Sequence, residues 1–159
     1  MRRAALAAAL AALPGAAPAG AVLTLTIDGS VHSFVPQMEG ARTGFSRFAT
    51  LEAVSIEGTD GPGRMVVELS LPSGARAGDA PYAVRISFRP DGWRDYWVSP
   101  PELPGAAVTV EALDLSGPAP RIAGSFEAPL CFTPTPLHPP DATRCRTASG
   151  RFATPLVPD

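Results

Sequence analysis

Hydrophobic and polar residues alternate along much of the chain beyond residue 20. In the segment RMVVELSL (64–71) every odd position is apolar, whereas the even positions include Glu68 and Ser70. The segment YAVRISF (82–88) has the same period, with Tyr82 and the other even positions apolar. A period of two residues is typical of a β-strand that buries one face. Both segments are therefore predicted to be strands, with Tyr82 on the buried side.

The rest of the chain also resembles a series of strands separated by turns rich in Gly and Pro. Outside the first 19 residues no stretch has the period of an amphipathic helix. Eight or nine short strands without helices indicate an antiparallel sandwich or barrel, and of these we expect a two-sheet β-sandwich, one all-β domain over residues 20–159. The further strands are expected within 22–35, which turns at Asp28-Gly29, and within 47–57, 93–98, 106–115, 121–132 and 145–157.

The first 19 residues have the pattern of a secretory signal peptide. Arg2 and Arg3 precede an Ala/Leu run over 4–13, and Ala17-Pro18-Ala19 has the small residues of a cleavage site. We expect cleavage after Ala19 and export by the general secretory route. The chain contains no Lys and no Asn, which indicates a GC-rich bacterial genome. The periplasm is therefore the expected location, with secretion as the alternative.

Charge and hydropathy argue against a nucleic-acid partner and against a membrane-spanning helix. Loss of Arg2 and Arg3 would leave eleven basic against fifteen acidic residues, a net charge of about −4 without a basic cluster. Such a chain is not suited to phosphate backbones, so no nucleic-acid partner is expected. Beyond the signal no apolar run approaches the roughly 18 residues of a membrane-spanning helix, so no membrane span is expected either.

The two cysteines, Cys131 and Cys145, enclose a proline-rich segment that contains His138. The segment could be a reactive or metal-binding loop, or it could be closed by a disulfide. In an exported chain with only two cysteines a disulfide is favoured. Closing a loop of about 15 residues would stabilise the fold by roughly 3 kcal/mol in the chain-entropy model.

A disulfide across an antiparallel pair also fixes the register of the flanking segments. If Cys131 faces Cys145, Phe126 lies opposite Gly150 and Phe152 lies opposite Gly124. Each ring would then cover a glycine of the neighbouring strand. One face of the hairpin becomes apolar, with Arg146 as its single misfit at the open end.

The second face of this hairpin is polar. There Glu127 and Arg151 become diagonal neighbours, and an exposed ion pair between them would contribute no more than about 1 kcal/mol. Pro129 and Pro155 each remove a backbone donor, which predicts a strand edge or a local bulge.

Residues that could support metal binding or catalysis do not form a recognisable pattern. His32 and His138 lack a second ligand at metal-like spacing, so neither a metal site nor a cofactor is expected. The chain has no G-x-S-x-G, S-x-x-K, H-E-x-x-H or C-x-x-C motif, and no catalytic residue is assigned.

The densest aromatic segment is DGWRDYWV (91–98). On a continuous strand Trp93, Asp95 and Trp97 would share one face, with the two indoles about 13 Å apart. Exposed, they would form a platform on which a sugar could stack. The alternative is that one Trp belongs to the core and the other covers the end of a sheet.

Together these patterns predict a noncatalytic exported module that binds a protein partner or an envelope glycan, or that has a structural role. The alternative is a hydrolase-like enzyme whose site is assembled from loops. Fold class does not decide between them, since one fold supports many functions.

Overall fold

The computed structural model describes residues 20–92, 94–100 and 106–159; the expected signal peptide lies outside them. The described part is all-β, apart from one 3-10 turn at Glu39–Ala41, and none of its helices is long and apolar enough to cross a membrane. The strands are β1 (Val22–Ile27), β2 (Ser30–Pro36), β3 (Gly44–Arg47), β4 (Leu51–Asp60), β5 (Gly63–Pro72), β6 (Ala83–Arg89), β7 (Tyr96–Val98), β8 (Ala107–Asp114), β9 (Arg121–Thr133), β10 (Asp141–Pro155) and β11 (Val157–Pro158).

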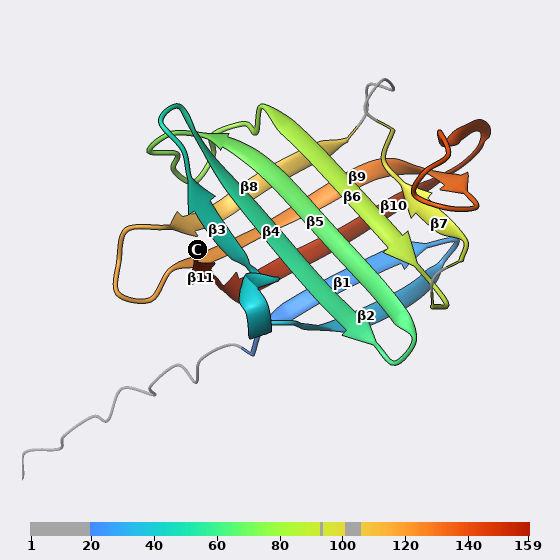
Figure 1. Cartoon of the computed structure of the whole chain (residues 1–159), viewed down its shortest axis with the longest axis horizontal. Coiled ribbons are helices and arrows are strands. Elements are labelled where there is room, and N and C mark those ends of the chain that lie inside the picture. Colours follow the sequence, from blue (N-terminus) through green and yellow to red (C-terminus); the bar gives the residue numbers. More distant parts are fainter. Residues whose placement is uncertain (1–19, 93, 101–105) are drawn as a thin grey trace, which may run out of the picture.

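The strands form one sheet that closes into an antiparallel barrel, so the expectation of a two-sheet sandwich is wrong. Pairing runs in the order β4-β2-β1-β10-β9-β7-β6-β5 and returns to β4, a ring of eight strands. The ring is flattened: β4, β5 and β6 cross in front of β9, β10 and β1 (Figure 1). β8 is added beside β9, and β3 beside β4.

Closure depends on two strands that change neighbours along their length. β4 pairs with β3 over residues 52–55 and with β2 at residues 58 and 59. β9 pairs with β8 up to Glu127 and with β7 from Cys131 onward. Pro129 lies between these two partners, where a missing backbone donor costs no ladder hydrogen bond on that edge. The ring therefore closes through short pairings at β2–β4 and β7–β9.

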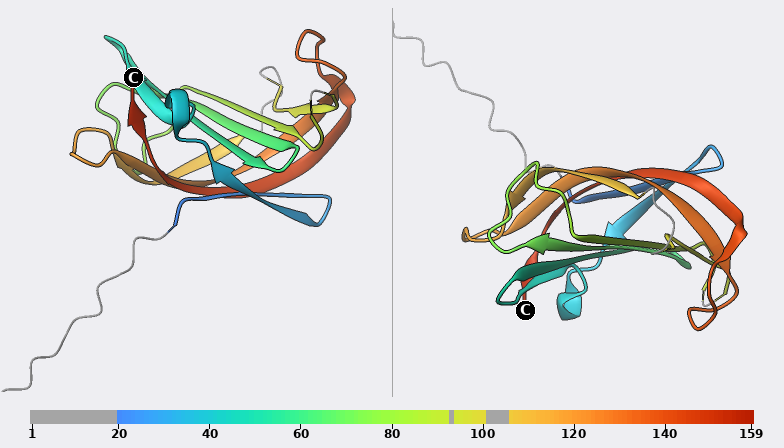
Figure 2. Two further views of the ribbon diagram at one scale, coloured as in Figure 1. Left: turned by 60° about the horizontal axis from the view of Figure 1, so that its bottom comes forward. Right: turned by 90° about the horizontal axis from the view of Figure 1, so that it is seen from above.

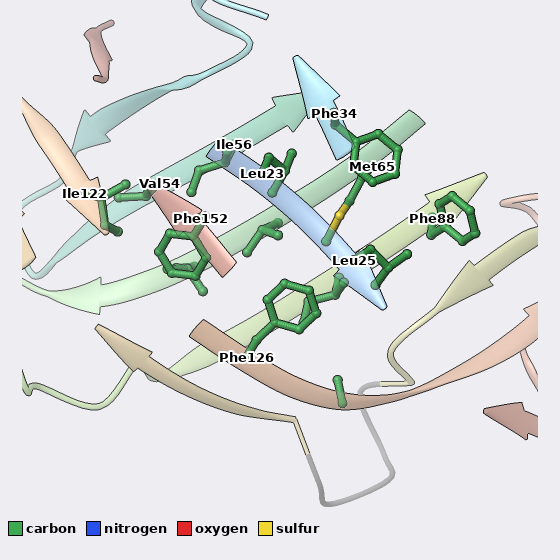
Figure 3. Packing of buried hydrophobic residues seen from close by; sticks show 14 of the residues in the cluster. Leu23, Leu25, Phe34, Val54, Ile56, Met65, Phe88, Ile122, Phe126 and Phe152 are labelled. Atoms are coloured by element: carbon green, nitrogen blue, oxygen red, sulfur yellow. The ribbon is translucent and has the colours of Figure 1, made fainter. Parts of the chain in front are cut away.

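Side chains from all eight strands of the ring fill its interior. Figure 3 shows the packing of several of them, among them Phe34, Met65 and Phe126. Many of them are completely buried, as expected when the apolar positions of each strand face inward. Burying a Leu, Ile, Phe or Met side chain stabilises the fold by about 1.5–3 kcal/mol. The ring strands contribute, among others, Leu25, Phe34, Ile56, Met65, Ile86, Trp97, Phe126 and Phe152.

The predicted register of the C-terminal hairpin is confirmed. Cys145 lies opposite Cys131, Gly150 opposite Phe126 and Phe152 opposite Gly124. A Cβ atom added at Gly150 would lie 2.4 Å from the Phe126 ring and 2.1 Å from the carbonyl oxygen of Thr24 in β1. The rings thus occupy the space that the glycines leave, and Phe126 and Phe152 are buried.

Other local predictions differ from the structure. The segment 47–57 is not one strand, because a turn after Arg47 separates β3 from β4. Tyr82 precedes β6 and is 72% exposed rather than buried. Arg151 pairs with Glu111 of β8 at 2.9 Å, not with the predicted Glu127, because β8 lies beside β9 on this surface.

Candidate functional site

The outer face of β3, β4, β5 and β6 carries two rows of mostly small side chains. The alternate positions of these strands, such as Val54 and Leu69, point into the core. Strand pairing places Ser46, Ala53, Ser70 and Ala83 side by side in one row, and Gly44, Ser55, Glu68 and Arg85 in the next.

These rows form the floor of a groove, named here the outer groove, with a volume of about 720 Å³. Asp159 borders it beside β3, and Pro136, His138 and Pro140 of the loop between β9 and β10 border it beside β6. In both views of Figure 2 this loop and the C-terminus rise on the same side of the β4–β5–β6 layer. Four strands at about 4.8 Å spacing make the floor about 14 Å wide. Small side chains between raised borders produce the hollow.

One pair of opposite charges lies on the floor of the outer groove. Arg85 Nε is 3.9 Å from Glu68 Oε2, and the two side chains are 63% and 51% exposed. At that distance the pair is an ion pair without a hydrogen bond, and at such exposure its contribution to stability is small. At the border the Ser46 hydroxyl donates to Asp159 Oδ2 at 2.9 Å.

A disulfide and hydrogen bonds within the β9–β10 loop hold the border that this loop forms. The disulfide joins Cys131 and Cys145, whose Cα atoms are 3.9 Å apart, at the base of the loop. The predicted disulfide is thus confirmed, and it leaves no thiolate for catalysis or metal binding at these positions. Thr135 Oγ1 lies 2.7 Å from His138 Nδ1. Thr133 Oγ1 lies 3.1 Å from the carbonyl oxygen of His138.

A further bond network lies where the loop enters β10. The Thr143 hydroxyl and backbone N–H donate to Asp141 Oδ1 at 2.7 and 2.9 Å. These hydrogen bonds, the hydroxyl first, hold the pKa of Asp141 below its usual value. The group is solvent-exposed, so we assign it to local loop structure.

The described residues of the expected Trp platform, Asp95 and Trp97, do not share one exposed face. Trp93 lies outside the described residues. Asp95 is exposed with a φ of 58°, which interrupts the extended backbone, and β7 includes only residues 96–98. Trp97 is 9% exposed and packs edge-on against Phe132, with ring centroids 5.7 Å apart. Trp97 therefore belongs to the core, and sugar binding at these residues stays a prediction.

Trp97 takes part in a stack of arginines and aromatic rings. The Arg146 guanidinium lies 4.3 Å from the Trp97 ring centroid, and the Arg144 guanidinium lies 3.8 Å from the Phe132 centroid. Arg146 also pairs with Asp28 of the first hairpin. The predicted misfit on the apolar face is thus explained, because its charge lies at the open end above an aromatic ring.

The two histidines lie in separate environments. His32 packs on Phe88, with centroids 5.0 Å apart, and its Nδ1 is 3.7 Å from Asp60 Oδ2. His138 belongs to the loop at the outer groove. Within the ranges that the structure describes, no three His, Cys, Asp or Glu side chains are grouped to hold a metal ion.

The outer groove was not predicted from the sequence. Its signal lay in the polar faces of 64–71 and 82–88, where Ser70 and Ala83 are small. From alternation alone these faces are expected to be exposed to solvent. A groove on them can be recognised only when it is known which strands lie side by side.

Comparisons with protein families, with curated proteins and with solved structures found no match for this chain.

Proposed function

We propose that the chain is an exported, periplasmic, noncatalytic binding module that uses the outer groove to hold a component of the cell envelope, a glycan or a protein. The observation that carries the proposal is the groove itself. A groove with a volume of about 720 Å³ that is lined by a few polar side chains has the size and composition of a ligand site. Secretion beyond the envelope is the alternative location.

A noncatalytic role agrees with the groups that line the groove. Its carboxylates among the described residues are Glu68, which faces Arg85, and Asp159, which accepts a hydrogen bond from Ser46. A hydrolase needs a nucleophile or an activated water beside an acid or base. At the border the Thr135 hydroxyl lies 2.7 Å from His138 Nδ1, but no ion pair among the described residues joins His138 to a carboxylate, so the pair lacks the third group that orients a catalytic base.

Binding is tested by filling the groove. Ser70→Trp places an indole on the floor, and Ser149→Trp places one on an exposed position of β10 as the matched control. Residues 20–159 should sediment with isolated envelope fragments, the groove variant should lose at least ten-fold in affinity, and the control should not. Equal sedimentation of both variants, or none for the parent protein, would contradict the proposal.

Export is tested separately. In a bacterial host the protein should accumulate in the periplasmic fraction with Gly20 as its first residue, determined by intact mass. A cytoplasmic protein that retains residues 1–19 would contradict this part of the proposal.

A further inference from the structure

Building on the binding role proposed above, we propose that the outer groove takes an uncharged saccharide chain, with Glu68 and Arg85 as its central polar contacts. Three features of the groove point to this ligand class: hydrogen-bonding groups with unused capacity, a floor whose charges cancel, and strands that expose side chains rather than backbone.

The polar groups on the floor are available to a ligand. Among the hydrogen bonds found in the described residues, none uses the hydroxyl of Ser55 or Ser70. Arg85 and Glu68 meet only at 3.9 Å, so the guanidinium donors and the carboxylate acceptors face solvent. Sugar hydroxyls both donate and accept hydrogen bonds. A guanidinium, a carboxylate and two hydroxyls side by side match that mixed character.

The charges on the floor select for an uncharged ligand. Glu68 and Arg85 are of opposite sign and adjacent, so the charges of the floor cancel. Asp159 adds one carboxylate at the border, where it accepts a hydrogen bond from Ser46. A phosphate or a carboxylate bound at Arg85 would also lie beside the carboxylate of Glu68. An ammonium bound at Glu68 would likewise lie beside Arg85. An uncharged polyol avoids both repulsions.

The two central strands of the floor, β4 and β5, do not offer a backbone edge to a peptide. β4 pairs with β3 and β5, and β5 pairs with β4 and β6, so both edges of the central strands are occupied. Strand addition, by which extended peptides join a sheet, is therefore blocked at these two strands. A helix would need an apolar surface, whereas the second row ends in Glu68 and Arg85.

Apolar contacts for the faces of sugar rings lie beside the polar ones. Ala53 and Ala83 present methyl groups from the first row. Pro136 and Pro140 of the β9–β10 loop add apolar ring surface at the border. Methyl groups and proline rings give the face of a pyranose an apolar surface to pack against.

The test is calorimetric titration of residues 20–159 with four uncharged tetrasaccharides, namely β-1,4-linked glucose, α-1,4-linked glucose, β-1,3-linked glucose and β-1,4-linked N-acetylglucosamine. We expect at least one to bind, with amide shift changes in NMR spectra at Ser55, Ser70 and Ala83. Glu68→Gln and Arg85→Gln should each weaken binding at least ten-fold. Glu111→Gln, which changes a carboxylate that is 41% exposed and paired with Arg151 outside the groove, should leave affinity unchanged.

Two results would overturn the assignment. One is that no tetrasaccharide binds; the other is that binding occurs without shifts in the groove, or weakens equally in the Glu111 variant. If envelope fragments still bind through the groove while all four sugars fail, the binding role stands and its ligand is a protein segment. If Ser70→Trp also has no effect on envelope binding, the proposed function itself fails.

Discussion

At the residue scale, the contacts of Phe126 and Phe152 show how two glycines determine the packing of the C-terminal hairpin. Each ring lies over a glycine on the neighbouring strand, and a Cβ at Gly124 would lie 2.7 Å from the Phe152 ring and 2.3 Å from the carbonyl oxygen of Thr109. Backbone on one side and a buried ring on the other leave no room for a methyl group. The glycines are thus required by close approach between strands.

Substitution Gly150→Ala should therefore be costly. The added methyl group meets the Thr24 carbonyl oxygen and the Phe126 ring, so we expect unfolding in urea to show a loss of about 1–3 kcal/mol. Ser149→Ala, on the neighbouring exposed position, is the control and should stay within about 0.5 kcal/mol of the parent. Similar stability for the two variants would mean that the rings do not pack on the glycines.

The same scale shows why Trp97 could not be assigned to core or surface from the sequence. Alternation placed Trp93, Asp95 and Trp97 on one face of a strand. The left-handed backbone at Asp95 breaks that periodicity, and it is unusual for a residue other than glycine. A single dihedral angle of this kind leaves no mark in the hydrophobic pattern.

At the scale of elements, the hairpin β9–β10 was the most predictable part of the chain. The cysteines fix one pair of residues, the alternation of apolar positions fixes the face, and both agree only in the observed register. β3 was missed, and β7 is shorter than expected. Short strands carry too few residues for a period of two to be recognised.

The disulfide should stabilise this element and, with it, a border of the outer groove. Replacing both cysteines with Ala should reduce the free energy of unfolding by roughly 3 kcal/mol, because the unfolded chain is no longer cross-linked across 14 residues. Urea denaturation of the two proteins measures the difference. The intact mass of the parent, prepared without reductant, should be two hydrogens below the reduced value; two free thiols would contradict the bond.

At the scale of the whole molecule, the closed ring replaces the edges that a sandwich would leave open. The decisive contact is between β2 and β4, where the Gln37 N–H donates to the Glu57 carbonyl oxygen at 2.7 Å just beyond the paired residues. Gly58 lies at this junction, and a Cβ there would be 2.7 Å from Leu23 and 2.8 Å from Phe34. Close approach of these strands allows the ring to close.

Closure is tested by Gly58→Ala and by NMR. In the parent, nuclear Overhauser effects should connect Val35 with Thr59, and the Gln37 amide should exchange slowly with solvent. The variant should lose about 1–3 kcal/mol of stability and exchange faster at Gln37, because the methyl group pushes β2 from β4. Ser55→Ala, on the outer face of the same strand, should do neither. Absence of contacts between β2 and β4 in the parent would show that the sheet is open.

The sequence by itself determined the all-β class, the first hairpin turn, the inward faces of β5 and the register of β9 with β10. These properties follow from the order of neighbouring residues along the chain and from one disulfide bond, and both can be inferred from the sequence. Only the tertiary structure decided between sandwich and barrel, the burial of Trp97 and the existence of the outer groove. Each of these depends on which strands lie side by side, and alternation has the same period in a sandwich as in a closed ring.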